Sequence, residues 1–224
     1  MPITLTSKEI RNGIAYLALN LLLLPGLVSM VGLGLGLDMA GINFCYYFLN
    51  FAFVLWIFRK FLWGNVLVAL DRLFPVLWYG ILGYLGYETV TNLVSALIFL
   101  INPAFVNFND ATVASMVTQS PLLAFSVIAL VPLAEETLYR GLVFRGLYEK
   151  NHILAYCVSM AFFSAIHVVG YADVLSPAQL LFSFIQYLPA GYCLCFVYRR
   201  SGTIITPIAV HMAINAMAVL AHVR

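Results

Sequence analysis

Three ionisable side chains interrupt an apolar run in the stretch Val131-Pro-Leu-Ala-Glu-Glu-Thr-Leu-Tyr-Arg140. They are Glu135, Glu136 and Arg140, and the residues around them are apolar enough to cross a membrane. On insertion scales a charge at the centre of a bilayer costs at least about 2.5 kcal/mol, so a group of three requires a compensating structure. The stretch therefore predicts a membrane-spanning helix that carries a polar site.

The composition of the whole chain supports a membrane location. Of its 224 residues, 63% are hydrophobic and 9% are charged, whereas a soluble domain has about 45–50% apolar and about 25% charged residues. The fold class predicted is an all-α polytopic membrane protein, a single membrane domain over residues 1–224. It is a bundle of about seven transmembrane helices (six to eight) with a polar intramembrane cavity. The predicted spans are 13–37, 41–58, 75–100, 121–146, 152–170, 178–198 and 203–222.

The lysines and arginines test this layout independently. With the N-terminus in the cytoplasm, nine of the eleven fall on the cytoplasmic side, as the positive-inside rule requires. Residues 63–74 look amphipathic and are predicted to lie along that interface. Residues 101–120 are predicted to form the long outer loop, with an eighth span there as the alternative. The four cysteines fall in apolar segments and are interpreted as core residues. No basic patch suits nucleic acid.

Polar side chains recur at a spacing of four residues in three spans. The pairs are Glu136 with Arg140, Phe163 with His167, and His211 with Asn215. Residues four apart share one face of a helix. Glu135 points about 100° away from Glu136 and has no partner on its own helix.

Depth groups these pairs at one level of the membrane. Asn151 marks a cytoplasmic turn, and Glu135 precedes it by as many residues as His167 follows it. Equal distances from the turn of an antiparallel hairpin imply equal depth. The rise of a helix places Glu135 at about 15 Å and His211 at about 12 Å from the interface. Taken singly, Glu136 with Arg140 would more often be a structural ion pair, each histidine or Asn215 a packing contact, and Phe163 part of the core. The shared level favours one catalytic site.

In these motifs the chain resembles the CAAX prenyl protease family, also called CPBP or Abi. That family carries Glu-Glu-x-x-x-Arg, Phe-x-x-x-His and His-x-x-x-Asn in this order on successive transmembrane helices. The corresponding stretches here are Glu135–Arg140, Phe163–His167 and His211–Asn215, with every signature position intact. The resemblance covers about residues 120–220. It divides the chain into variable N-terminal helices over 1–120 and catalytic helices over 121–222.

The resemblance implies an intramembrane endopeptidase whose cavity opens towards the cytoplasm. Glu135 would act as general base on a water that His167 also holds, and His211 and Asn215 would stabilise the oxyanion. Arg140 would keep Glu136 ionised. The expected substrate is a membrane-associated peptide or protein, and the short loops favour a prokaryotic plasma membrane. No cofactor is expected, because the glutamate-dependent mechanism is preferred over a zinc site made by Glu135, His167 and His211.

Two readings without proteolysis stay open from the sequence. The first is a non-catalytic membrane protein of the same fold that acts in bacteriocin immunity or binding. The second is a proton-coupled transporter, because carboxylates and histidines also form proton relays.

Overall fold

The computed structural model describes residues 3–223, with side chains through residue 221. Within this part of the chain all regular structure is helical, which confirms the all-α polytopic bundle. The elements are α1 Ser7–Leu22, α2 Leu24–Gly34, α3 Met39–Ile57, α4 Arg59–Asp71, α5 Leu73–Ile101, α6 Phe108–Gln119, α7 Pro121–Phe125, η1 Ser126–Leu130, α8 Val131–Glu136, η2 Thr137–Phe144, α9 Arg145–Tyr148, α10 His152–Ile166, η3 Val169–Tyr171, α11 Pro177–Ser201 and α12 Ile205–Val223.

Five helical stretches of the described chain are long and apolar enough to cross a membrane. A bent pair, α1 with α2, makes a sixth if it is one span. The last predicted span is a shorter apolar helix, Ile205–Ala221. The long stretches are Met39–Ile57, Leu73–Ile101, Pro121–Tyr148, His152–Tyr171 and Pro177–Ser201.

The first predicted span, 13–37, differs most from the structure. Its helix begins earlier, at Ser7, and bends by 56° at a break between Leu22 and Leu24. Pro25 lies in the first turn of α2. Proline has no backbone N–H and its ring clashes with the carbonyl four residues back, so it favours a kink or break in a helix.

The helix that contains the acidic motif is continuous but irregular. Pro121–Tyr148 runs through α7, η1, α8, η2 and α9. Two parts of it, Ser126–Leu130 and Thr137–Phe144, have π-helical hydrogen bonding. Such bulges are rare in proteins as a whole. Those that do occur are often found at functional sites. Glu135 and Glu136 end the α-helical turn between the two π-helical segments.

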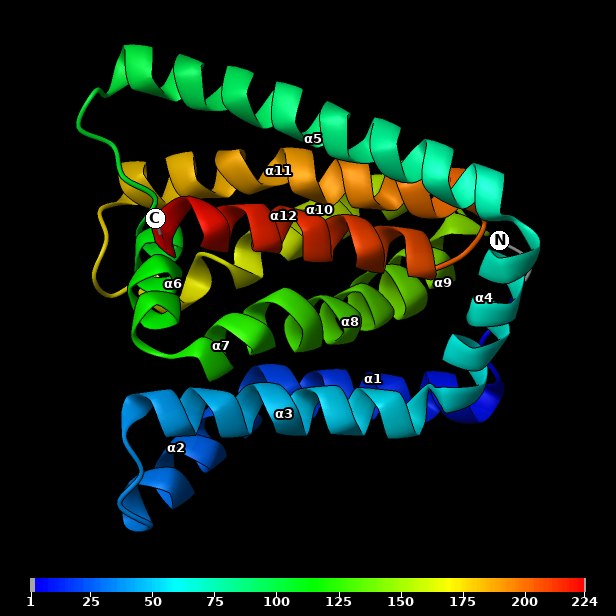
Figure 1. Ribbon diagram of the computed structural model, residues 1–224, viewed down its shortest axis with the longest axis horizontal. Helices are drawn as coiled ribbons and strands as arrows, with labels where there is room; N and C mark the ends of the chain where they lie inside the picture. The colour runs from blue at the N-terminus through cyan, green and yellow to red at the C-terminus, as the bar shows by residue number, and fades with distance from the viewer. Residues whose placement is uncertain (1–2, 224) are drawn as a thin grey trace.

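Different elements lie at the two ends of the bundle (Figure 1). At one end α4 crosses the bundle near the N-terminus, α9 and the turn between α11 and α12. This helix begins four residues before the predicted interfacial segment 63–74 and ends at Asp71. At the opposite end lies α6, so part of the predicted outer loop 101–120 is a short helix, capped by Asn107.

The start of α12 is fixed by α4. The Asn65 side-chain oxygen accepts from the Ile204 backbone N–H at 3.0 Å, and the Thr203 hydroxyl donates to the Asn65 carbonyl at 2.8 Å. Gly202 precedes this point with a φ of 82°, a left-handed conformation that favours glycine. Together these contacts set where α12 enters the bundle, and α12 carries His211 and Asn215.

Small residues bring the helices of the C-terminal half close together. A Cβ added at Gly191 of α11 would lie 2.9 Å from the Met160 Cα of α10. A Cβ added at Gly83 of α5 would overlap with Val197 Cγ1 of α11. Close backbone approach of this kind is typical of helix packing in membranes.

Candidate active site

The acidic motif forms a buried hydrogen-bonded group with the third motif. Arg140 Nη1 donates to Glu136 Oε1 at 2.9 Å, and both side chains are 0% exposed. The same oxygen lies 2.8 Å from His211 Nδ1. Because an ionised carboxylate only accepts hydrogen bonds, His211 Nδ1 is the donor in this contact. Glu136 therefore connects the cation on its own helix to the histidine on α12.

Glu135 has a different environment from its neighbour. Its side chain lines a cavity of about 340 Å³. Its Oε2 atom is buried and has no hydrogen-bond partner among the described residues. A buried carboxylate oxygen without a protein donor is costly unless a solvent or ligand group satisfies it. Glu136 Oε2 likewise has no partner among the described residues, but Glu136 does not line the cavity, so Glu135 is the carboxylate that is available for chemistry.

His167 lines the same cavity with one nitrogen already engaged. His167 Nδ1 lies 2.8 Å from the Phe163 backbone carbonyl, so this nitrogen carries the proton and donates. In the neutral ring the lone pair is then on Nε2. His167 can therefore accept a hydrogen bond from, or orient, a group in the cavity.

Phe163 contacts residues of the site and is not only part of the apolar core. Its ring centroid lies 4.5 Å from that of His167 and 5.8 Å from that of His211. The Arg140 guanidinium carbon lies 4.3 Å from the same ring centroid, a cation–π distance. Phe163 thus contacts one residue of each motif, namely Arg140, His167 and His211.

Asn215 also lines the cavity, and part of its hydrogen-bonding capacity is used. Its Nδ2 donates to the Val127 carbonyl of η1 at 2.8 Å. This contact ties α12 to the first π-helical segment. An amide nitrogen carries two protons, so one N–H of Asn215 is not needed for it.

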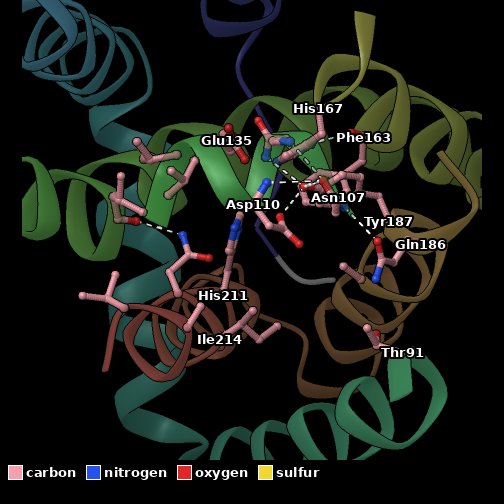
Figure 2. Close-up of a pocket in the computed structure, with 18 of the residues that line it drawn as sticks. Thr91, Asn107, Asp110, Glu135, Phe163, His167, Gln186, Tyr187, His211 and Ile214 are labelled. Carbon is pink, nitrogen blue, oxygen red and sulfur yellow. Dashed lines mark hydrogen bonds between the residues drawn. The ribbon is translucent and has the colours of Figure 1, made fainter. Parts of the chain in front are cut away.

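Four of the six predicted residues therefore meet at one cavity, and the other two support it from behind. Glu135, His167, His211 and Asn215 line the cavity. Glu136 and Arg140 are packed behind it, joined to it through His211. Figure 2 shows Glu135, His167 and His211 around a common space, in which Asp110 and Asn107 also appear.

Sequence reasoning missed the polar wall that α6 and α11 build opposite the motifs. The Tyr187 hydroxyl donates to Asp110 and accepts from Asn109 Nδ2 at 2.8 Å. Asn107 Nδ2 donates to Gln186 Oε1 at 2.9 Å. The Asn and Asp residues of 101–120 were a visible signal, but they were interpreted as loop residues. Only their helix and its docking on α11 bring them to the cavity.

Tyr187 joins this wall to the motifs. Its ring stacks on His167, with centroids 4.5 Å apart and planes inclined by 30°. His167 thus contacts the backbone carbonyl and ring of Phe163 and the ring of Tyr187.

The zinc alternative concerns the three possible ligands Glu135, His167 and His211. Within the described part of the chain, no group of three or more His, Cys, Asp or Glu side chains is placed to hold a metal ion. In particular, Glu135, His167 and His211 share a cavity without forming such a group. These residues do not fit a three-ligand zinc site as they stand.

The fold and the site together define a polytopic helical membrane protein with a carboxylate and two histidines around a cavity inside the bundle. Comparison with known proteins finds a family model that matches part of the chain. Residues 117–217, which contain all three motifs, match the sequence model of a family described as type II CAAX prenyl endopeptidase Rce1-like. The resemblance to CAAX prenyl proteases is therefore confirmed over these residues.

Two relatives were also found. The chain is 27% identical over 113 residues to "Putative membrane peptidase YdiL" of Bacillus subtilis (strain 168), a match that covers 50% of this chain and 42% of that protein. It is 25% identical over 140 residues to "UPF0177 protein YxdF" of Lactococcus lactis subsp. lactis (strain IL1403), covering 61% of this chain and 72% of that protein. No solved structure matches the chain significantly.

Proposed function

We propose that this protein is an intramembrane endopeptidase that hydrolyses a peptide bond of a membrane-associated peptide or protein. One observation carries the proposal. Glu135 presents a buried carboxylate oxygen without a protein partner at a cavity that His167 and His211 also line. The family match and the name of one relative support a membrane peptidase as the class.

In the proposed mechanism Glu135 is the general base. A water in the cavity lies between Glu135 and His167 Nε2, and the carboxylate accepts its proton as the oxygen attacks the peptide carbonyl carbon. A positioned base of this kind contributes about 10²–10⁴-fold to a rate. The protonated Glu135 then gives its proton to the leaving amine, which completes hydrolysis without a covalent intermediate.

The negative charge on the carbonyl oxygen is stabilised by His211 and Asn215. The free N–H of Asn215 and Nε2 of a doubly protonated His211 are the proposed donors. One such donor is worth about 3–4 kcal/mol in the transition state when it is preorganised. Glu136 accepts from Nδ1 of His211 at 2.8 Å, so it fixes the orientation of that ring. Arg140 neutralises Glu136 at this depth.

The proposed location is the plasma membrane of a prokaryote, with the N-terminus in the cytoplasm. The apolar helices make it an integral membrane protein. The distribution of lysine and arginine supports this orientation. Its partners would be the lipid bilayer and a membrane-associated substrate, with no role for nucleic acid.

The proposal can be tested in cells. Small membrane-associated peptides are compared by mass spectrometry among cells that express the wild type, Glu135→Gln or no copy of the gene. We expect a set of cleaved peptides that appears with the wild type alone. If cells with the wild type and cells with Glu135→Gln contain the same peptides and have the same phenotype, a non-catalytic immunity or binding role is favoured instead.

Chelation is expected to leave peptide hydrolysis unchanged within about twofold. In the proposed mechanism the nucleophilic water is held by Glu135 and His167, and no step requires a bound metal. The measurement is the initial rate of the purified protein before and after dialysis against a strong chelator. If the chelator abolishes activity and added zinc restores it, the zinc mechanism is favoured instead.

Tyr187 is expected to act by positioning His167. We predict that Tyr187→Leu lowers kcat by about two- to tenfold, because an aromatic contact is worth about 0.5–1.5 kcal/mol. Tyr187→Phe keeps the ring on His167 and should keep kcat near that of the wild type. An equal loss in both variants would show that the hydroxyl contacts with Asp110 and Asn109 matter, and not the stacking.

A further inference from the structure

The two ends of the bundle differ in charge. Nine lysines and arginines lie at the end formed by the N-terminus, α4, α9 and the turn between α11 and α12 (Figure 1). They are Lys8, Arg11, Arg59, Lys60, Arg72, Arg145, Lys150, Arg199 and Arg200. At the opposite end the charged side chains that the structure describes are acidic, namely Asp38, Asp110 and Asp173.

The cavity extends from Glu135 towards the acidic end. Its lining includes the α6 cap Asn107, α6 residues as far as Val117, and the second half of α12, from His211 to Val219. None of the nine cationic residues and no part of α4 or α9 lines it. Asp110 is exposed and Asn109 half-buried, so the rim of the cavity is at α6.

On the cationic side of Glu136 and Arg140 the bundle interior is packed. Phe61, Phe144 and Tyr198 are at most 1% exposed. The Phe144 ring lies 6.4 Å from that of Tyr198 and 5.1 Å from that of Tyr156. This aromatic layer lies between the site and the cationic end. No residue that lines the cavity lies on the cationic side of the layer.

We infer that the site is entered from the α6 end, which is the extracytoplasmic side, and that the substrate is an extended peptide segment presented on that side of the membrane. The inference rests on the proposed endopeptidase function. Cationic loops remain in the cytoplasm, so the opposite end faces outwards. A cavity of about 340 Å³ suits a short stretch of peptide and excludes a folded domain. The direction of access is opposite to the cytoplasmic opening that the family resemblance implies.

Single cysteines and a membrane-impermeant sulfonated maleimide test the direction of access. Ala114→Cys places a thiol on the α6 wall of the cavity, and Lys150→Cys places one in the exposed turn at the cationic end. The wild type gives the background of its own cysteines, of which Cys193 and Cys195 are buried. We expect at least about fivefold faster labelling of Ala114→Cys in intact cells than in inverted membrane vesicles, and the reverse for Lys150→Cys.

The outcomes separate this inference from the proposed function, because labelling requires no catalysis. Labelling of both variants from the same side, of Ala114→Cys from the inside only, or of Ala114→Cys from neither side would overturn outward access. The proposed endopeptidase function would not be decided by these labelling results. It is tested separately, by peptide hydrolysis with the purified protein. As a second measure, the maleimide adduct of Ala114→Cys should lose peptide hydrolysis, whereas that of Lys150→Cys should keep it. Full hydrolysis by the Ala114→Cys adduct would also contradict a substrate path along α6.

Discussion

Glu135→Gln is expected to lower peptide hydrolysis by about 10²–10⁴-fold while the protein remains folded and inserted. Glutamine has the size of glutamate but cannot accept the proton of the attacking water. Because no described residue donates to the buried Oε2 atom of Glu135, the substitution breaks no protein contact of that atom. The rate is measured under single-turnover conditions, so that product release does not mask the chemical step.

The neighbouring acid provides the matched comparison. Glu136→Gln removes the charge that faces Arg140 and His211 without changing the cavity wall. It should reduce activity through the orientation of His211, and it should also lower the stability of the protein. A Glu135→Gln protein that turns over substrate at the wild-type rate would refute its assignment as base. A loss of folding in Glu135→Gln would show that this residue is structural.

Arg140→Met is expected to destabilise the protein by about 3–5 kcal/mol, because it leaves the buried Glu136 charge without its cation. Both side chains of this pair are 0% exposed, so solvent cannot compensate. The measurement is the unfolding midpoint in a mixed-micelle denaturant titration. The control is Glu149→Gln, which removes an ion pair whose acid is 70% exposed and should cost about 0–1 kcal/mol.

A double variant separates charge from packing at the same site. Arg140→Met combined with Glu136→Gln removes both charges and keeps similar volumes. Much of the lost stability should return, since replacing a buried pair by neutral groups is often close to neutral. Activity should stay low, because His211 loses its carboxylate partner. If the single and double variants are equally unstable, packing of the Arg140 side chain on Phe163 is the main contribution.

The level of the site was predictable from sequence because it depends on regular geometry. Asn151 caps α10 with a hydrogen bond to the Leu154 N–H at 3.0 Å, so the turn is where the sequence placed it. Glu135 and His167 lie equally far from this turn along two helices. A constant rise per residue then brings both side chains to one cavity.

Contacts between helices were not predictable in the same way. The bond from His211 to Glu136 depends on how α12 is rotated against α8, and no spacing within one helix encodes that rotation. The π-helical turns on either side of the two glutamates also change which residues share a face. The docking of α6 on Tyr187 is a tertiary contact of the same kind. The bend after Leu22, in contrast, had a visible local cause in Pro25.

The central claim is that Glu135 directs a water molecule onto a peptide bond inside the membrane. The most direct measurement is cleavage of membrane peptides by purified wild type and Glu135→Gln in H₂¹⁸O, followed by mass spectrometry of the products. We predict new carboxyl termini that carry one ¹⁸O with the wild type, and almost none in the same time with Glu135→Gln. Equal amounts of labelled product from the two proteins, or no cleavage by the wild type, would contradict the claim.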